Sequence, residues 1–255
     1  MAEREPIIRF EGVRKAFGPN LVYDGLDLEV FPGETLTVIG GSGVGKSVML
    51  KLLIGLMTPD AGVVTAFGED VTRMSEKRLI ELRGRIAMLF QGAALFDSMT
   101  VEDNIKYPLV EHNWGTAAEM DQRVEEVLEM VDMPGVQRLR PAELSGGMKK
   151  RVGLARAIAI EPEVILYDEP TTGLDPITVR RINGLILSLQ KRLGVTSLVV
   201  THDMDSAFTV SDRFALVYHP RITFVGTPDE AREAQLRYLR EFVAGGRGTL
   251  HEDVD

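Results

Sequence analysis

Eight residues between positions 40 and 47 have the types and spacing of a phosphate-binding loop. The stretch GGSGVGKS fits the P-loop pattern G-x-x-x-x-G-K-[ST]. Its glycines let backbone N–H groups curl around phosphates, and the helix expected after it adds a partial positive charge. We expect Lys46 to reach the β- and γ-phosphates of a nucleotide and Ser47 to ligate Mg²⁺. The residues expected to contact the nucleotide are Gly40, Gly41, Ser42, Gly43, Val44, Gly45, Lys46 and Ser47.

A pair of adjacent acids ends the apolar stretch VILYDEP. Asp168, at the end of the expected buried strand, is suited to hold Mg²⁺ through water, and Glu169 is suited to polarise an attacking water. Two neighbouring carboxylates at such a strand end are costly unless a cation or a proton uses them. A solvated acidic turn is the alternative, but the P-loop upstream favours nucleotide hydrolysis.

A second turn suited to an anion lies in LSGGMKKRVGLARAIAI. Ser145 is expected to cap a helix, and Gly146 and Gly147 allow close approach of the backbone. One nucleotide cannot readily contact two such turns of the same chain. We therefore expect a head-to-tail pair of chains, in which the serine turn of each faces the γ-phosphate held by the other.

Alternating strands and helices must position these groups. Buried strands of the kind found in parallel sheets are expected at residues 35–39 and in IAMLF, EVILYDEP and VTSLVVTHD. Helices are expected in KSVMLKLLIGLM and PITVRRINGLILSLQKRLG, and from about Gly92 to Ile160 the pattern is helical. The sequence thus predicts an α/β parallel sheet with a helical insertion.

Composition narrows the classes of function. The chain has 255 residues, a formal net charge of −9 and no cysteine. The acidic balance argues against binding a nucleic-acid backbone, and the lack of cysteine excludes disulfides, thiolate nucleophiles and Cys-ligated zinc. The start, MAEREPIIRFEG, is too charged for a signal peptide, and no apolar run approaches the roughly 20 residues that span a bilayer. We expect any membrane role to come through a partner.

Together these motifs resemble those of ABC-transporter ATPase subunits, over residues 7 to about 226. In the family's pattern Phe17 resembles the aromatic residue that stacks on adenine, and Gln91 resembles the Q-loop glutamine that senses Mg²⁺ and the attacking water. Asp175 resembles the D-loop residue that crosses the dimer interface, and His202 resembles the switch histidine on the γ-phosphate. The resemblance implies ATP and Mg²⁺ as cofactors, and ATP hydrolysis coupled to translocation.

The resemblance also implies a domain organisation. The fold expected is a P-loop NTPase with a RecA-like, mostly parallel sheet, an antiparallel β edge and a helical subdomain. Residues 1–245 would form one domain, with a core and β subdomain in residues 1–90 and 161–227. Residues 92–160 would form the helical subdomain, residues 228–245 a C-terminal helix and residues 246–255 a flexible tail.

Four residues depart from the family's usual pattern. Met148 stands where glutamine is commoner and cannot donate an amide hydrogen bond. Tyr167 replaces an aliphatic residue before the acids, Gly41 stands where proline is frequent, and Phe17 stands where many members have tyrosine. None of these changes removes a group that hydrolysis needs.

The segment after the glutamine carries the finer resemblance. The stretches LFQGAALFDSMTVEDNI, YPL, LSGGM and DPIT are similar to the ATPases of Mla-type lipid transporters, which belong to the MCE systems. This implies an Mla-type transmembrane permease, a periplasmic MCE protein and a small STAS-domain protein as partners. It also implies a peripheral location on the cytoplasmic face of the inner membrane. Leu95, Phe96 and Met99 would either line a groove for a permease helix or form the core of the helical subdomain.

Three other functions fit parts of the pattern. An ABC ATPase for another cargo, such as amino acids, shares the core motifs. A non-transport ABC protein of DNA repair or translation typically carries coiled-coil insertions or tandem cassettes, whereas this chain has one P-loop and no long heptad run. A P-loop kinase would use Asp168 or Glu169 to activate a substrate hydroxyl, but LSGGM has no role there.

Overall fold

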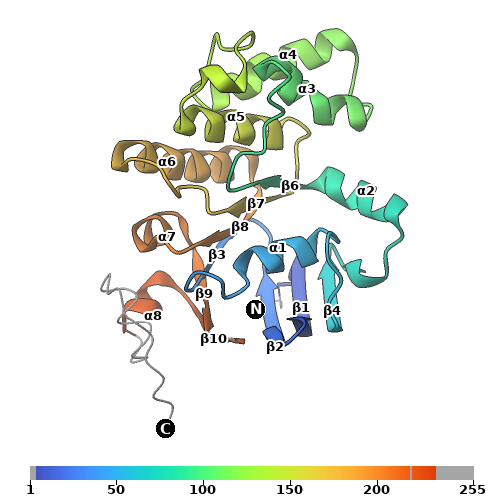
Figure 1. Cartoon of the computed structure of the whole chain (residues 1–255), viewed down its shortest axis with the longest axis vertical. Helices are drawn as coiled ribbons and strands as arrows, with labels where there is room; N and C mark the ends of the chain where they lie inside the picture. The colour runs from blue at the N-terminus through green and yellow to red at the C-terminus, as the bar shows by residue number, and fades with distance from the viewer. Residues whose placement is uncertain (1–3, 219, 234–255) are drawn as a thin grey trace.

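Two sheets and a helical layer build the molecule (Figure 1). The computed structural model describes residues 4–218 and 220–233. The six-stranded sheet has the order β10-β9-β3-β8-β7-β6, in which only the β9–β10 pairing is antiparallel. Its strands are β3 (Thr35–Ile39), β6 (Ile86–Leu89), β7 (Val164–Asp168), β8 (Thr196–Thr201), β9 (Arg213–Tyr218) and β10 (Arg221–Gly226). This arrangement confirms the predicted α/β class.

The four-stranded sheet is antiparallel, with the order β2-β1-β4-β5. Its strands are β1 (Ile8–Phe17), β2 (Asn20–Val30), β4 (Ala61–Ala66) and β5 (Glu69–Asp70). Apolar side chains alternate along the second half of β2, where Leu26, Leu28 and Val30 are buried. This alternation is typical of a strand with one face on the core.

Helices cover the parallel sheet and form a separate layer beyond it (Figure 1). They are α1 (Lys46–Leu53), α2 (Glu76–Arg85), α3 (Val101–Glu111), α4 (Ala117–Met130), α5 (Gly146–Ile158), α6 (Pro176–Leu193), α7 (Met204–Val210) and α8 (Pro228–Glu233). Short 3₁₀ turns lie at Val71–Arg73 and Pro141–Glu143. Among the residues described, no helix is both long enough and apolar enough to cross a bilayer.

The three central strands are buried on both faces because helices and the second sheet cover them. Every residue of β3, β7 and β8 is buried. One apolar cluster joins Leu36 and Val200 to the antiparallel sheet and α1. A second cluster joins Tyr167 and Val199 to α3–α6. Parallel strands fixed in this way present their carboxyl ends at one common edge.

Some boundaries differ from those expected. The helix after the P-loop ends at Leu53, because the N–H groups of Leu56 and Met57 both turn back to the Lys51 carbonyl. Helix α2 was not foreseen, since its sequence is mostly charged and only Leu79 and Leu82 are buried in it. The expected C-terminal helix starts at Pro228 as α8, but residues 234–245 and the tail lie outside the described residues.

Candidate nucleotide-binding site

The predicted catalytic groups gather at the carboxyl ends of four strands. The P-loop follows β3, Gln91 follows β6 and His202 follows β8, while Asp168 ends β7 and Glu169 comes directly after it. These strands are adjacent in the order β3-β8-β7-β6. The edge of the sheet therefore brings together residues that lie up to 160 positions apart in the chain, where open α/β sheets commonly bind ligands.

The P-loop is held in shape by its own backbone and by strand β2. Gly45 has a φ of 101° and caps α1. The buried Tyr23 hydroxyl donates to the Gly45 carbonyl at 2.7 Å. A methyl group at Gly45 would lie 2.3 Å from Val22 Cγ1, so only glycine fits here without a shift. These contacts hold the loop in its shape without a ligand. The first N–H groups of α1 follow the loop in the chain.

Lys46 is the buried cation of the loop. Its Nζ donates to the carbonyls of Gly40 and Gly41, both at 2.9 Å, and lies 3.6 Å from Glu169 Oε1. Burial lowers the pKa of the Lys46 ammonium below its usual value, although the carboxylates of Glu169 and Asp168 oppose this shift. To reach a phosphate, the ammonium exchanges these carbonyl oxygens for phosphate oxygens.

The carboxylate of Glu169 accepts hydrogen bonds from several residues around the pocket. Its Oε2 lies 2.9 Å from His202 Nδ1 and accepts from the Thr172 and Thr201 hydroxyls at 3.0 and 3.3 Å. Burial alone would raise the pKa of the Glu169 carboxyl. The hydrogen bond from His202 and the charge of Lys46 outweigh burial, so the pKa lies below its ordinary value. The carboxylate is therefore ionised at neutral pH and able to accept a proton.

The donor set beside the loop suits a hard divalent cation. Ser47 Oγ donates to Asp168 Oδ1 at 2.7 Å, and Gln91 lines the same pocket as Ser47. Hydroxyl, carboxylate and amide oxygens are the ligands that Mg²⁺ prefers, usually completed by waters and substrate phosphates. Within the described residues, no group of three or more His, Asp or Glu side chains could hold a metal by itself.

A pocket of about 340 Å³ opens between these groups, and its lining includes Lys46, Ser47, Gln91, Glu169 and His202. A neighbouring hollow is lined by Phe17, a residue that is 44% exposed, and shares Gly43, Gly45 and Val48 with the first. The exposed ring therefore lies beside the phosphate pocket, where a flat base could stack on it.

Two predicted contact sites lie elsewhere. Ser145 caps α5 and accepts from the Met148 N–H at 3.3 Å, and it is exposed to solvent. Asp175 caps α6, where its carboxylate accepts from the N–H groups of Ile177 and Thr178. Neither the serine turn (Ser145, Gly146 and Gly147) nor Asp175 lines the pocket of its own chain. The structure thus brings the P-loop, Gln91, Asp168, Glu169 and His202 together, and leaves the turn free to face outward.

Sequence reasoning did not find three supporting residues: Tyr23, Thr172 and Lys150. The first two contact the P-loop and Glu169 as described above, and Lys150 Nζ donates to the Glu169 carbonyl at 3.1 Å. For Lys150, the only signal in the sequence is the pair of lysines after LSGGM, and this pair also fits an ordinary solvated helix. The sequence does not mark Tyr23 or Thr172. Tyr167, which differs from the aliphatic residue usual in the family, is fully buried in the core between the sheet and the helices.

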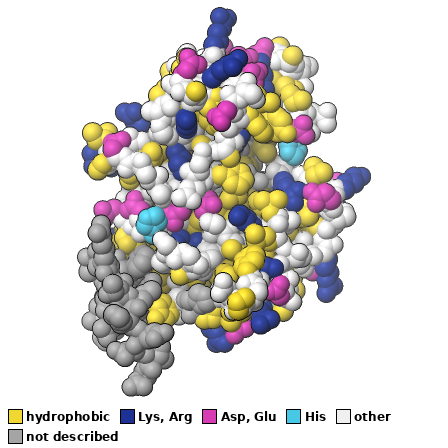
Figure 2. Space-filling view, viewed as in Figure 1, with side chains coloured by type: hydrophobic (Ala, Val, Ile, Leu, Met, Phe, Trp, Pro, Cys, Tyr) yellow, Lys and Arg dark blue, Asp and Glu magenta, His cyan; other side chains and the backbone are white. Residues whose placement is uncertain are grey.

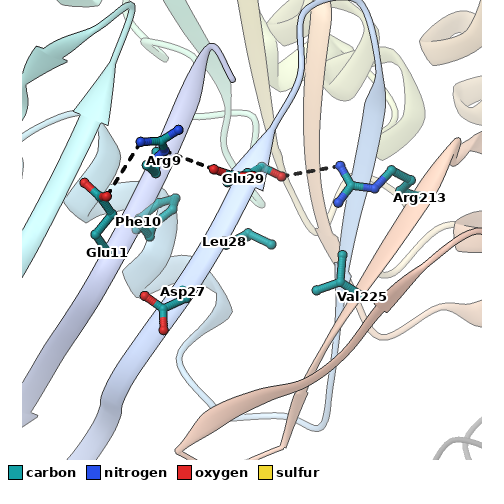
Figure 3. A pocket seen from close by; sticks show the side chains of 8 residues that line it. All are labelled: Arg9, Phe10, Glu11, Asp27, Leu28, Glu29, Arg213 and Val225. Atoms are coloured by element: carbon teal, nitrogen blue, oxygen red, sulfur yellow. Dashed lines mark hydrogen bonds and ion pairs between the residues drawn. The ribbon is translucent and has the colours of Figure 1, made fainter. Parts of the chain in front are cut away.

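A larger groove of about 480 Å³ lies between the two sheets (Figure 3). Its charged side chains all have partners, and Asp27 accepts from the Gly12 N–H at 2.7 Å. Arg9 pairs with Glu11 and Glu29, and Arg213 reaches the Glu29 carbonyl and pairs with Glu34. With its charges so paired, the groove presents no group prepared for chemistry, and we assign it no site.

Comparison with known proteins places the chain among transport ATPases. The family model for "ABC transporter" matches residues 23–172. The "probable ribonucleotide transport ATP-binding protein mkl" of Mycobacterium leprae is 37% identical over 94% of this chain and 69% of its own. The "intermembrane phospholipid transport system ATP-binding protein MlaF" of Haemophilus influenzae is 38% identical over 89% of this chain and 86% of its own. The "methionine import ATP-binding protein MetN 2" of Rhodococcus jostii is 41% identical over 94% and 72%.

Among solved structures, the chain is similar to the ATP-binding cassette MJ0796. That structure is a dimer in a post-hydrolysis state bound to ADP and Pi. The TM-score is 0.79 at 29% sequence identity, and the match covers 86% of this chain and 98% of the cassette.

Proposed function

Because the chain belongs to the ABC transporter family and is an ATPase of that family, we propose that it powers phospholipid transport between the inner and outer membranes. The cluster of Lys46, Glu169 and His202 at the strand ends carries the hydrolytic part of this proposal. The likeness to MlaF and the amino-acid sequence of the segment after Gln91 support the lipid cargo. The proposed partners are an Mla-type permease, an MCE protein and a STAS-domain protein, on the cytoplasmic face of the inner membrane.

In the proposed mechanism two chains close around two ATP molecules. Each ATP lies between the Gly40–Ser47 loop of one chain and the serine turn of the other. The exposure of Ser145 and its separation from the pocket of its own chain support this head-to-tail arrangement. The dimeric state of the similar cassette MJ0796 is consistent with it. Phe17 stacks on the adenine, and Asp175 lies at the contact between the two chains.

Hydrolysis depends on three side chains in this arrangement. Glu169, kept ionised by its donors, takes a proton from the water that attacks the γ-phosphate. Lys46 and His202 stabilise the negative charge that develops on the phosphate oxygens. Ser47, Asp168 and Gln91 would hold Mg²⁺, which when bound neutralises phosphate charge.

An apolar groove beside Gln91 is the proposed contact for the permease. Figure 2 shows hydrophobic side chains exposed at mid-height on one face, below the helical layer. The lining of the groove, whose volume is about 440 Å³, includes Phe96 and Tyr107. Their ring centroids lie 4.8 Å apart, and the two residues are 41% and 40% exposed. Leu95, the neighbour of Phe96, instead packs against the helical core, which supports the alternative expectation for that residue.

Helix α5 is tied to this groove by one arginine. Arg156 donates to the carbonyls of Ala93 and Ala94, both of which have positive φ. The loop after Gln91 is thereby fixed to the helix that begins with the serine turn. A movement of α5 when the dimer opens would therefore reach the permease contact.

The test is co-purification in mild detergent from the native membrane, with partners and bound lipids identified. An Mla-type permease, an MCE protein and phospholipid are expected. Phe96→Ala with Tyr107→Ala should weaken recovery of the permease, whereas Leu56→Ala, which shortens a more exposed apolar side chain outside the groove, should not. Recovery of an amino-acid permease without an MCE protein would replace the lipid proposal with amino-acid import, which the likeness to MetN 2 favours as the second candidate.

A further inference from the structure

Lys150 is a buried cation that the mechanism above does not use. It lies in the second turn of α5 and is 5% exposed. Its Nζ donates to the carbonyl oxygen of Glu169 at 3.1 Å, and it does not line the nucleotide pocket. Burial lowers the pKa of the Lys150 ammonium, opposed by the carboxylates of Asp168 and Glu169. Burying a cation costs free energy, so solubility alone does not explain a lysine at this position.

The backbone that Lys150 contacts is in an uncommon conformation. Glu169 has a φ of 48°, in the left-handed region that non-glycine residues rarely adopt. Such a residue persists only where its surroundings impose the conformation. Its N–H donates to the Val200 carbonyl at 2.9 Å, and its own carbonyl accepts from Thr172 N–H only at 3.4 Å. The ammonium of Lys150 is thus the shortest contact and the sole charged one to that carbonyl among the described residues.

We propose that Lys150 is a positioning residue that fixes the backbone of Glu169 and links its orientation to helix α5. This inference rests on the proposed role of Glu169 as the base. Ser145 caps the same helix, five residues or about 7–8 Å along the axis from Lys150. When the serine turn of one chain meets the nucleotide of the other, a shift of α5 is carried by Lys150 to the base of its own site. Contact at the turn of one chain would then change the orientation of the base in that chain's own site.

A purely structural role for Lys150 makes a different prediction. In that case Lys150→Met changes the melting temperature or the folded fraction, but kcat per folded molecule stays the same. Removing the ammonium takes one hydrogen bond from the Glu169 carbonyl, and the cost of one such bond is smaller than the stability of a typical domain, so the variant is expected to fold. If it does not, Lys150→Leu serves the same purpose with a shorter apolar side chain.

The test compares kcat and KM for ATP among position-150 variants and one control. Lys150→Met should lower kcat about 10–100-fold with KM within about twofold, because a small misplacement of a reacting group has effects of this size. Lys150→Arg keeps a donor and should recover kcat to within about fivefold of the wild type. Lys149→Met removes the same charge from the preceding position of α5 and should leave kcat and KM within about twofold of the wild type.

Glu169→Gln separates this inference from the proposal on which it rests. If Glu169→Gln alone keeps wild-type turnover, the base assignment is wrong. If Glu169→Gln is slow but Lys150→Met has wild-type kcat, only the Lys150 inference is overturned. If both are slow, adding Lys150→Met to Glu169→Gln should lower kcat by less than about twofold, since residues acting as a unit are not additive. A full second loss in the double variant would contradict the inference.

Discussion

Comparing Gly45→Ala with Gly43→Ala tests whether the side chain of Val22 restricts position 45 of the P-loop to glycine. Gly45 and Gly43 both have positive φ, 101° and 82°. Alanine at either position carries a backbone strain of about 1–3 kcal/mol. A methyl group at Gly43 meets nothing within 4 Å, whereas one at Gly45 lies 2.3 Å from Val22 Cγ1 and 3.2 Å from the Tyr23 ring.

The difference between the two variants isolates the steric clash. Overpacking of this kind costs about 1–3 kcal/mol, so Gly45→Ala should unfold more readily than Gly43→Ala by that amount. For a chain of this size this corresponds to roughly 3–10 °C in melting temperature. Thermal unfolding followed by circular dichroism measures the difference directly, and urea titration gives it as a free energy of unfolding.

Val22→Ala removes the atom responsible and provides the internal control. In a double-mutant cycle, the cost of Gly45→Ala should fall by about 1–3 kcal/mol when Val22→Ala is already present. The cost of Gly43→Ala should not change in that background. Equal melting temperatures for the two glycine variants, or additive effects in the cycle, would show that Val22 does not restrict position 45.

Three further predictions concern the pocket. Lys46→Ala should abolish nucleotide binding, measured with a fluorescent ATP analogue, because it removes the cation that meets the phosphates; unchanged binding would contradict the P-loop assignment. Glu169→Gln should bind ATP but hydrolyse it about 10²–10⁴-fold more slowly and accumulate as a dimer on size exclusion, and a monomer with normal turnover would count against it. Thr172→Val removes a hydroxyl donor from the Glu169 carboxylate and so raises its pKa. The base is then protonated at a higher pH, and the acid limb of the ATPase profile should move upward; Thr172→Ser, which keeps the hydroxyl, should leave it in place.

The catalytic edge could be predicted from sequence because each group follows a recognisable strand. The apolar runs VILY and TLTVI end directly before the acids and the P-loop. Parallel strands place their carboxyl ends together, so the order of the motifs along the chain was enough to predict their proximity. The serine turn was likewise predicted as a helix cap, and Ser145 holds that position.

Contacts through the backbone could not be predicted in the same way. The positive φ of Glu169 arises from the surrounding strand end, and no glycine or asparagine marks it in the sequence. Lys150 resembles any lysine on an exposed helix until the packing of α5 on the sheet edge buries it. Helix α2 was missed because charged residues dominate it and only two of its residues reach the core.

In the proposed dimer the P-loop of one chain faces the serine turn of another across ATP. The chain has no cysteine, so Ser42→Cys can be placed in one tagged copy and Met148→Cys in a second, both carrying Glu169→Gln. A short bis-maleimide should then join the two different copies covalently, and only when ATP is present. Failure to join them in saturating ATP, or joining of the two positions within a single chain that carries both cysteines, would contradict the account.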